Sequence, residues 1–240
     1  MKIFLAGATG IVGSRLIPLL LAAGHQVTGT ARSAEKAANL RSLGVNPAIV
    51  DALDAEGLNR AVGAALPEVV IHQLTSLPDR RDPERQAEVL EQNAQIRREG
   101  TRNLVAAALQ AGARRIVAQS VAWLYAAGPV PHGESDPLDL GAEGSRAVSV
   151  RGVSELERLV LSAAPLVGVV LRFGYLYGPG TWYAERTGEV SLHIDAAARA
   201  SALAITRGGA GLFNVVDDGG SATNAKARLE LGWDPTWRAS

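Results

Sequence analysis

The first thirteen residues, Met1-Lys-Ile-Phe-Leu-Ala-Gly-Ala-Thr-Gly-Ile-Val-Gly13, decide the fold. The apolar run Ile3–Ala6 suits a central parallel strand, and glycines follow at three-residue spacing, at Gly7, Gly10 and Gly13. The first glycine allows a sharp turn, the second lets backbone approach a pyrophosphate, and the third lets a following helix pack on the sheet. The N-terminus of that helix adds free N–H groups and a positive dipole end. The stretch therefore predicts a site for a nicotinamide or flavin dinucleotide.

The composition restricts the function classes. The chain has 240 residues, 47% of them hydrophobic, which is enough for one sizeable core. Its 24 basic and 24 acidic residues balance, so we expect no nucleic acid or anionic membrane as partner, and no apolar stretch is long enough to span a bilayer. Because there is no cysteine, disulfides, thiolate metal sites and cysteine nucleophiles are excluded, and we expect no metal. Three glycines and Pro18 argue against an N-terminal secretory signal, so we expect a cytoplasmic protein.

Strand and helix patterns alternate along the first 172 residues, which predicts an α/β fold with a doubly wound parallel sheet, the Rossmann fold. The expected strands are 3–6, 26–31, 48–50, 69–72, 116–119 and 167–172. The expected helices are 12–23, 33–43, 54–65, 84–111 and 145–162. We expect an NAD(P)-binding domain over residues 1–172 and a small C-terminal substrate-binding portion, interleaved with the sheet, over residues 173–240. In such a sheet the ligand lies beyond the carboxyl ends of the strands.

The residues after the second and third strands indicate which dinucleotide binds. An acidic residue after the second strand would mark NAD, but this chain has Ala31 followed by Arg32. A small residue with an arginine leaves room and charge for a 2′-phosphate, which favours NADP(H) and leaves NAD(H) open, although Arg32 could also be a solvated helix-start residue. The segment Asp51–Leu53 could bind the adenine, while Asp51 and Asp54 could equally cap a helix.

Several segments of the chain form a recognisable set. Besides the glycine-rich turn, they are Asp51-Ala-Leu-Asp54, Gly100-Thr-Arg-Asn-Leu104, Ser120 to Tyr125, Leu171-Arg-Phe-Gly-Tyr-Leu-Tyr-Gly-Pro-Gly180, His193-Ile-Asp195, Phe213-Asn-Val215 and Asn224-Ala-Lys-Ala-Arg-Leu-Glu-Leu-Gly-Trp233. Together they resemble the extended short-chain dehydrogenases/reductases, often described as NAD-dependent epimerases/dehydratases, over nearly the whole chain. The resemblance implies a Rossmann domain that binds NAD(P), a C-terminal portion that closes over the substrate, and a homodimer built on two long helices per subunit.

The strand ends and the resemblance together give the expected cofactor contacts. They are Gly7, Thr9, Gly10, Ile11, Val12, Gly13, Arg32, Asp51, Ala52, Leu53, Gln73, Leu74, Thr75, Gln119, Ser120, Phe173 and Tyr175. His72, at the end of the fourth expected strand, is expected to be a hydrogen-bonded core histidine rather than a catalyst.

The chain departs from the family at the proton-transfer residues. Family members normally carry a tyrosine, which gives or takes the proton, and a lysine four residues later, which lowers the tyrosine pKa and holds the ribose. No tyrosine of this chain is followed by such a lysine. Counted back from Glu157, the two positions fall at Ser149 and Val153, and the helper serine falls at or beside Ser120. The family's usual activity therefore cannot simply be carried over.

The chain is also shorter than the family pattern. Stretches that family members have before the His193-Ile-Asp195 segment and before Asn224 are absent. Either the substrate lid is trimmed, or the printed sequence lacks loops, in which case an intact mass well above 25.0 kDa would show it.

A missing proton donor favours a substrate that becomes a stable anion when reduced. Hydride addition to an isolated ketone gives an alkoxide whose conjugate acid has a pKa of about 15.7, whereas addition to a quinone gives a phenolate-like anion with a pKa of about 10. The difference corresponds to about 8 kcal/mol that the enzyme need not supply. We therefore expect an NADPH-dependent reductase of a conjugated or aromatic carbonyl compound, such as a quinone-type or polyketide-like secondary metabolite. The alternatives are a sugar-nucleotide epimerase or dehydratase and a non-catalytic NADP(H) sensor.

Aromatic residues after the fifth and sixth expected strands could hold a flat substrate. The expected substrate-binding residues are Trp123, Tyr125, Tyr177, Trp182 and Tyr183. Several of them could instead pack the C-terminal portion against the sheet. The candidate catalytic proton donors are Ser120, Tyr125 and Tyr175, with His132 as a further possibility in a loop.

Overall fold

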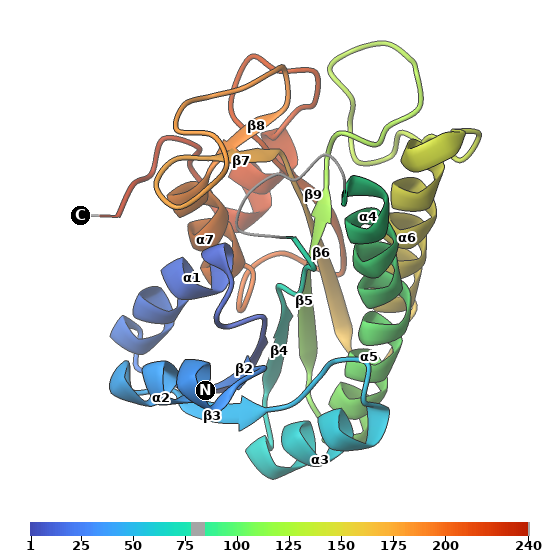
Figure 1. Ribbon diagram of the computed structural model, residues 1–240. Helices are drawn as coiled ribbons and strands as arrows, with labels where there is room; N and C mark the ends of the chain where they lie inside the picture. Colours follow the sequence, from blue (N-terminus) through green and yellow to red (C-terminus); the bar gives the residue numbers. More distant parts are fainter. Residues whose placement is uncertain (78–84, 240) are drawn as a thin grey trace.

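A parallel sheet with helices on both faces forms the centre of the molecule in the computed structural model, which describes residues 1–77 and 85–239 (Figure 1). The sheet has seven strands in the order β3-β2-β1-β4-β5-β6-β9, and every neighbouring pair is parallel. The strands are β1 (Lys2–Ala6), β2 (Gln26–Ala31), β3 (Asn46–Ile49), β4 (Val69–His72), β5 (Arg115–Val121), β6 (Val167–Phe173) and β9 (Gly211–Val215). The order reverses between β1 and β4, which creates the switch point where α/β sheets bind ligands.

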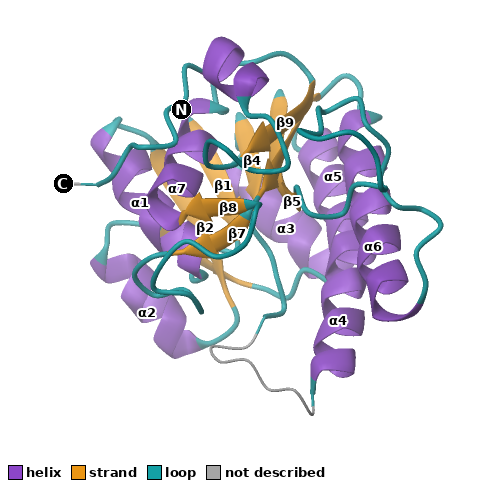
Figure 2. Cartoon of the chain, turned by 90° about the horizontal axis from the view of Figure 1, so that it is seen from above, coloured by secondary structure: helices purple, strands orange, loops and turns teal. Residues whose placement is uncertain are grey.

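The helices form one layer on each face of this sheet (Figure 2). They are α1 (Ile11–Ala22), α2 (Ala34–Ser42), α3 (Ala55–Ala65), α4 (Gln86–Gln95), α5 (Thr101–Gln110), α6 (Gly144–Leu161) and α7 (Ile194–Leu203), with π-helical turns η1 (Ile96–Gly100) and η2 (Ala227–Leu231). Apolar residues of α1, α2 and α7 share one core cluster, and those of α3, α5 and α6 share another on the opposite face. Among the residues that the structure describes, no helix is both long and apolar enough to cross a bilayer.

The doubly wound sheet expected from the sequence is confirmed, and the strands at 26–31 and 69–72 have the expected bounds. All six strands expected in the first 172 residues are present, and β9, from the C-terminal portion, adds a seventh beside β6 that the strand patterns did not predict. This strand is short, begins with Gly211 and carries the buried Asn214, so it lacks the apolar run that marks the other central strands. The expected helix 84–111 starts at Glu84, which lies outside the described residues, and η1 divides its described part into α4 and α5.

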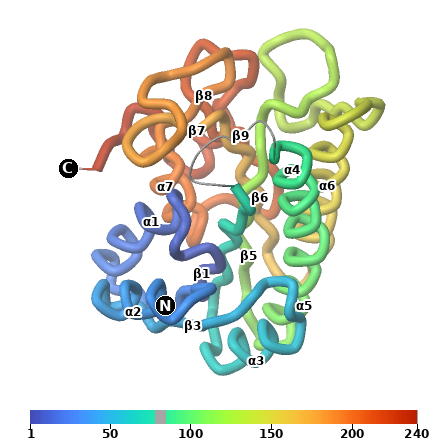
Figure 3. The backbone as a smooth tube through the Cα atoms, in the orientation of Figure 1, coloured from blue at the N-terminus to red at the C-terminus, as the bar shows by residue number. Residues whose placement is uncertain are grey.

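Residues 174–193, which follow β6, lie above the carboxyl ends of the sheet, next to α7 (Figure 3). It contains a two-stranded parallel sheet, formed by β7 (Tyr175–Tyr177) and β8 (Ser191–His193), which the sequence patterns did not predict. Each of these strands has three residues, too few for a period-2 pattern to be read. The segment after β6 is thereby held over the switch point of the main sheet.

Candidate active site

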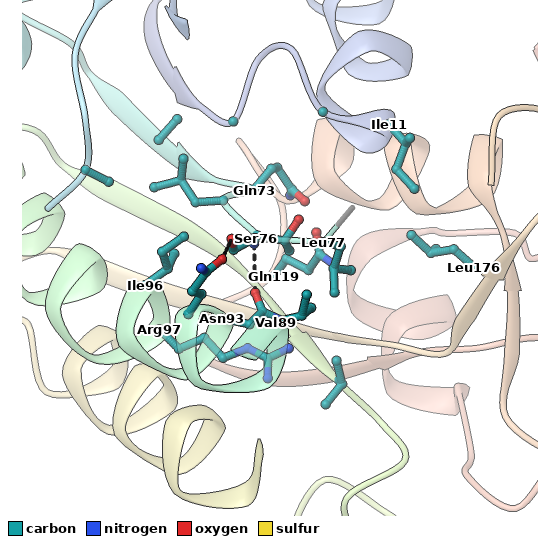
Figure 4. A pocket seen from close by; sticks show the side chains of 18 of the residues that line it. Ile11, Gln73, Ser76, Leu77, Val89, Asn93, Ile96, Arg97, Gln119 and Leu176 are labelled. Carbon is teal, nitrogen blue, oxygen red and sulfur yellow. Dashed lines mark hydrogen bonds between the residues drawn. The ribbon is translucent and has the colours of Figure 1, made fainter. Parts of the chain in front are cut away.

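A cavity of about 1230 Å³ lies at the carboxyl ends of the strands, over the switch point. Its walls come from the glycine-rich turn, the ends of β2, β4 and β5, the helices α4 and α6, and residues 174–183. Figure 4 shows part of this wall, with Gln73, Asn93, Arg97 and Gln119 around the opening. Small-molecule sites usually have about 300–1,000 Å³, so this cavity is large enough for a dinucleotide with a second small molecule beside it.

The glycine-rich turn meets the backbone requirements of a dinucleotide site. Gly7 has a φ of +90°, and a Cβ there would lie 2.5 Å from the carbonyl oxygen of Gln73. A Cβ on Gly13 would lie 2.2 Å from the carbonyl oxygen of Gly7, so α1 approaches the turn more closely than any side chain permits. Gly10 is the N-cap of α1 and provides no side-chain cap, which leaves the helix N-terminus open toward the cavity.

The end of β2 and the first turn of α2 place two cations on the cavity wall. Arg32 and Lys36 both line it, and Ala31 is buried at the position where an acidic residue would mark NAD. In the next segment, Asp51 lines the cavity and accepts a hydrogen bond from the Leu53 backbone N–H at 2.9 Å. Asp54 is the N-cap of α3 and accepts from the Gly57 N–H at 2.9 Å. The helix-cap reading therefore holds for Asp54, whereas Asp51 faces the cavity.

A buried polar atom on β4's side of the cavity lacks a partner. The side-chain nitrogen Nε2 of Gln73 donates to Ser201 Oγ at 3.1 Å, but its Oε1 accepts no hydrogen bond from any described residue. Such an atom fits a ligand that brings a hydroxyl or amide donor, as a dinucleotide does. The preceding residue, His72, contacts Thr101 Oγ1 at 2.8 Å, and burial lowers its pKa to about 4. His72 is thus a neutral, hydrogen-bonded core histidine, as expected.

The α6 wall lacks the family's proton-transfer pair. Ser149, the residue at the position where the resemblance implies a tyrosine, lines the cavity. Val153, at the lysine position, is fully buried in an apolar cluster with Val121, Leu124 and Val150. Position 153 therefore cannot supply a cation to this wall, and position 149 offers an aliphatic hydroxyl in place of a phenol.

A pair of aromatic rings also lines the cavity, and one of them, Trp123, packs against the apolar cluster that contains Val153. The rings of Trp123 and Tyr175 are stacked, with centroids 5.1 Å apart and planes 11° apart, and both residues line the cavity together with Trp182 and Tyr183. Tyr177 packs edge-on against His193 instead, with the ring centroids 5.1 Å apart, and does not line the cavity. The stacked pair offers a flat apolar face of the kind that holds planar ligands.

Most of the residues expected at the site line this one cavity. They are Gly7, Thr9, Gly10, Ile11, Arg32, Asp51, Ala52, Leu53, Gln73, Leu74, Thr75, Gln119, Trp123, Tyr175, Trp182 and Tyr183. The expected residues that lie outside the lining are Val12, Gly13, Ser120, Tyr125, Phe173 and Tyr177. Gly13 acts on the turn through packing, and Phe173 and Val12 belong to the apolar core.

Two of the candidate proton donors belong to a buried network behind the wall. Ser120 Oγ donates to Glu157 at 2.7 Å, and Arg172 donates two hydrogen bonds to the same carboxylate at 2.8 and 2.7 Å. Arg172 also donates to the Tyr125 hydroxyl at 2.8 Å, which in turn donates to Asn214 at 2.6 Å. Burial raises the pKa of Tyr125, although the nearby Arg172 charge opposes that shift. The hydroxyls of Ser120 and Tyr125 are thus engaged in structural hydrogen bonds.

Sequence reasoning missed several residues that line the cavity. They include the polar and charged residues Lys36, Asn93, Arg97 and Arg146, which come from the helical elements α2, α4, η1 and α6. Asn93 accepts a hydrogen bond from the Ser76 N–H at 3.0 Å, and Arg97 is 8% exposed. Reading only the strand ends could not find these residues, because Asn93, Arg97 and Arg146 reach the cavity through packing among α4, η1 and α6. Lys36 reaches it from α2, one turn beyond the end of β2.

Comparisons with known proteins agree with this geometry. A family described as NAD(P)H-binding matches residues 7–150. The chain is 45% identical over 234 residues to a 3-diazoavenalumate denitrifying reductase of Streptomyces sp, a match that covers 96% of this chain and 73% of the relative.

Solved structures share the fold at low sequence identity. The UDP-glucose 4-epimerase of Thermotoga maritima, solved with UDP-glucose, superposes with a TM-score of 0.80 at 18% identity, over 99% of this chain and 94% of that one. A dTDP-glucose 4,6-dehydratase from Streptomyces venezuelae, a double mutant with NAD bound, gives 0.78 at 17% identity, over 99% and 92%. These two likenesses concern the fold alone. The family match and the 45% identical reductase go further, because they show that the chain belongs to the NAD(P)H-binding family and is an oxidoreductase.

Proposed function

We propose that this oxidoreductase uses NADPH to reduce a flat aromatic acceptor whose reduction requires no proton from the enzyme. The observation that carries the proposal is the α6 wall, where Ser149 and Val153 replace the tyrosine and lysine of the family. An enzyme with this wall cannot protonate an alkoxide in the family's usual way. Reduced nicotinamide supplies a hydride, so the acceptor must tolerate receiving that hydride without acid catalysis.

The first candidate acceptor is an aryl diazo compound. The related Streptomyces reductase is named for a diazo substrate and for denitrification. In such a reaction an aryl diazonium ion takes up a hydride, the carbon–nitrogen bond breaks, N2 leaves, and a carbon–hydrogen bond takes its place. The balance is ArN2⁺ + NADPH → ArH + N2 + NADP⁺, with no net proton from the protein.

A quinone-type carbonyl compound is the second candidate, because it takes up hydride as a phenolate-like anion. The stacked rings of Trp123 and Tyr175 favour both acceptors, since each is planar and conjugated. In this scheme Trp123 and Tyr175 position the acceptor ring, and the open N-terminus of α1 binds the pyrophosphate. The unpartnered Oε1 of Gln73 accepts a hydrogen bond from a ribose hydroxyl or the carboxamide.

NADP(H) rather than NAD(H) is the cofactor that the β2 end supports. Arg32 and Lys36 line the cavity there, and Ala31 leaves space where an acidic side chain would repel a 2′-phosphate. A guanidinium and an ammonium together suit a dianionic phosphate ester. Two further expectations, a homodimer and a cytoplasmic location, stay predictions, and light scattering on the purified protein tests the first.

The test is a substrate panel that follows the absorbance of reduced nicotinamide and the products together. The panel contains an aryl diazonium salt, a quinone, an isolated ketone and UDP-glucose. We expect enzyme-dependent oxidation of NADPH with the first two, with N2 and the arene as products of the diazonium salt. Oxidation with UDP-glucose as the sole active compound, or with none of the four, would contradict the proposal. Tight NADPH binding without any turnover would instead indicate a sensor.

Two tryptophan variants test whether the stacked rings bind the acceptor. Trp123 lines the cavity, whereas Trp237 lies near the C-terminus, where it contacts Arg199. We expect Trp123→Ala to raise the KM for an aromatic acceptor by about tenfold, the effect of about 1.4 kcal/mol of lost ring contact. Trp237→Ala is expected to leave this KM unchanged. Equal effects of the two substitutions on the KM would contradict the assignment of Trp123 and Tyr175 to the substrate site.

A further inference from the structure

A buried arginine on the cavity wall lacks a partner. Arg97 lies in η1, is 8% exposed, and lines the cavity next to Asn93 and Val89 (Figure 4). Among residues 1–77 and 85–239, no side chain or carbonyl forms a hydrogen bond or ion pair with its guanidinium. A buried charge without a partner is costly, and proteins retain such groups chiefly where a ligand supplies the counter-charge.

The carboxylate of Glu157, whose charge acts on Arg97, is already hydrogen-bonded to other side chains. Glu157 acts on Arg97 through its charge, but it accepts hydrogen bonds from Arg172 and Ser120. Burial lowers the pKa of Arg97 to about 10 despite this influence, so the guanidinium remains charged at neutral pH. The wall therefore presents a largely buried positive charge to whatever occupies the cavity.

The cofactor alone does not supply the missing anion. Figure 4 places Arg97 and Ile11, the first residue of α1, on opposite sides of the cavity. The pyrophosphate belongs at the open end of α1, and the 2′-phosphate belongs at Arg32 and Lys36. Arg97 instead acts electrostatically on His72, at the end of β4, and on Glu157 of α6. The cofactor parts that extend along β4, the second ribose and the nicotinamide, carry no negative charge.

We propose that Arg97 binds a carboxylate group of the substrate. Its planar fork of N–H donors matches a carboxylate bidentately, and a charge-assisted pair in a desolvated wall is the strong form of this contact. With the ring held near Trp123 and Tyr175, the substrate is an aromatic carboxylic acid. The aromatic part of this statement rests on the proposed function, whereas the anion site follows from Arg97.

Binding of unreactive probes tests the site without turnover. Protein saturated with NADP⁺ is titrated calorimetrically with cinnamate and with neutral cinnamamide, for wild type, Arg97→Gln, Arg97→Lys and Arg98→Gln. Arg98 is the matched control, because it lies in the same turn but outside the cavity lining. We expect Arg97→Gln to weaken cinnamate binding by about 10- to 100-fold, the range of a charged hydrogen bond, and to leave cinnamamide unchanged. Arg97→Lys should fall between, and Arg98→Gln should match wild type.

Three results would overturn the anion site. They are equal affinity of wild type for both probes, equal weakening of both probes by Arg97→Gln, and a loss of NADP⁺ affinity in Arg97→Gln as large as the loss for cinnamate, which would make Arg97 a cofactor contact. A structural role would lower the melting temperature of Arg97→Gln, whereas removal of an unpaired buried charge should leave it at or above that of wild type. If the probe pattern holds while the substrate panel shows no reduction, the proposed function fails and the anion site stands.

Discussion

Two buried arginines, one on the cavity wall and one behind it, have opposite pKa shifts. Arg172 is 3% exposed, and burial alone would lower its pKa, but hydrogen bonds and charge from Glu157 outweigh burial and raise it. Arg97 is similarly buried at 8%, and burial lowers its pKa to about 10. The difference shows that pairing, rather than burial, separates a structural charge from one available to a ligand.

The largest expected effect comes from removing the charge that pairs with Arg172. Glu157→Gln leaves Arg172 buried without a counter-ion, so we expect the free energy of unfolding to fall by about 3–5 kcal/mol in urea titrations at pH 7. Glu155→Gln is the control on the same helix, because Glu155 forms surface pairs with Arg102 and Arg158 and should lose at most about 1 kcal/mol. Similar losses of stability in the two variants would contradict the view that the buried pair of Glu157 and Arg172 stabilises the fold.

The second prediction concerns the pH dependence of stability that arises from His72, whose pKa the unpaired charge of Arg97 helps to lower. Burial first, and the Arg97 charge second, lower the His72 pKa from 6.5 to about 4. Between pH 6.5 and pH 4 the His72 side chain therefore binds a proton in the unfolded chain but not in the folded protein. The free energy of unfolding falls as the pH drops through this range. The expected contribution is about 3 kcal/mol over this range.

The measurement compares urea unfolding of wild type and His72→Asn between pH 7 and pH 4.5. The difference between the two proteins should narrow as the pH falls, because only wild type carries this proton linkage at position 72. A constant difference across the range would show that His72 takes up its proton in the folded state.

The third prediction concerns the exposed end of the same cavity. Arg32→Ala should weaken NADPH binding by about 10- to 100-fold and leave NADH binding within about twofold, because one charged hydrogen bond to the 2′-phosphate is lost. Fluorescence titration with both cofactors measures this. Arg41→Ala, in the last turn of α2 and outside the cavity lining, is the control. Equal weakening of NADPH and NADH would contradict the assignment of NADP(H).

Local backbone requirements made part of this molecule predictable. Gly7 and Gly13 are readable from sequence because their places admit no Cβ, and β4 is readable because its first three residues, Val69–Ile71, form the apolar run of a buried parallel strand. Residues that follow parallel strands, such as Asp51 after β3 and Gln73 after β4, line the cavity because the carboxyl ends of these strands meet at one edge of the sheet.

The rest depends on packing between elements distant in the chain. Arg97 is cavity-lining because α4 packs on α6, and its neighbour Arg98, identical in type, lies outside the lining. Tyr125 and Tyr175 both follow central strands, yet one enters the network of Arg172 and the other faces the cavity. No local sequence pattern separates Arg97 from Arg98, or Tyr125 from Tyr175. For this reason the sequence alone could not show which of these side chains faces the cavity.

The smallest expected effect separates the two tyrosines. Tyr175→Phe keeps the ring that stacks on Trp123 and removes a hydroxyl that the proposed reaction does not need, so the rate of hydride transfer should stay within about twofold. Tyr125→Phe removes the hydroxyl between Arg172 and Asn214 and should cost about 1 kcal/mol of stability with the same small effect on rate. Single-turnover absorbance and urea unfolding measure the two quantities. A hundredfold slower transfer in Tyr175→Phe would identify that phenol as the proton donor and would return the chemistry to reduction of an ordinary carbonyl.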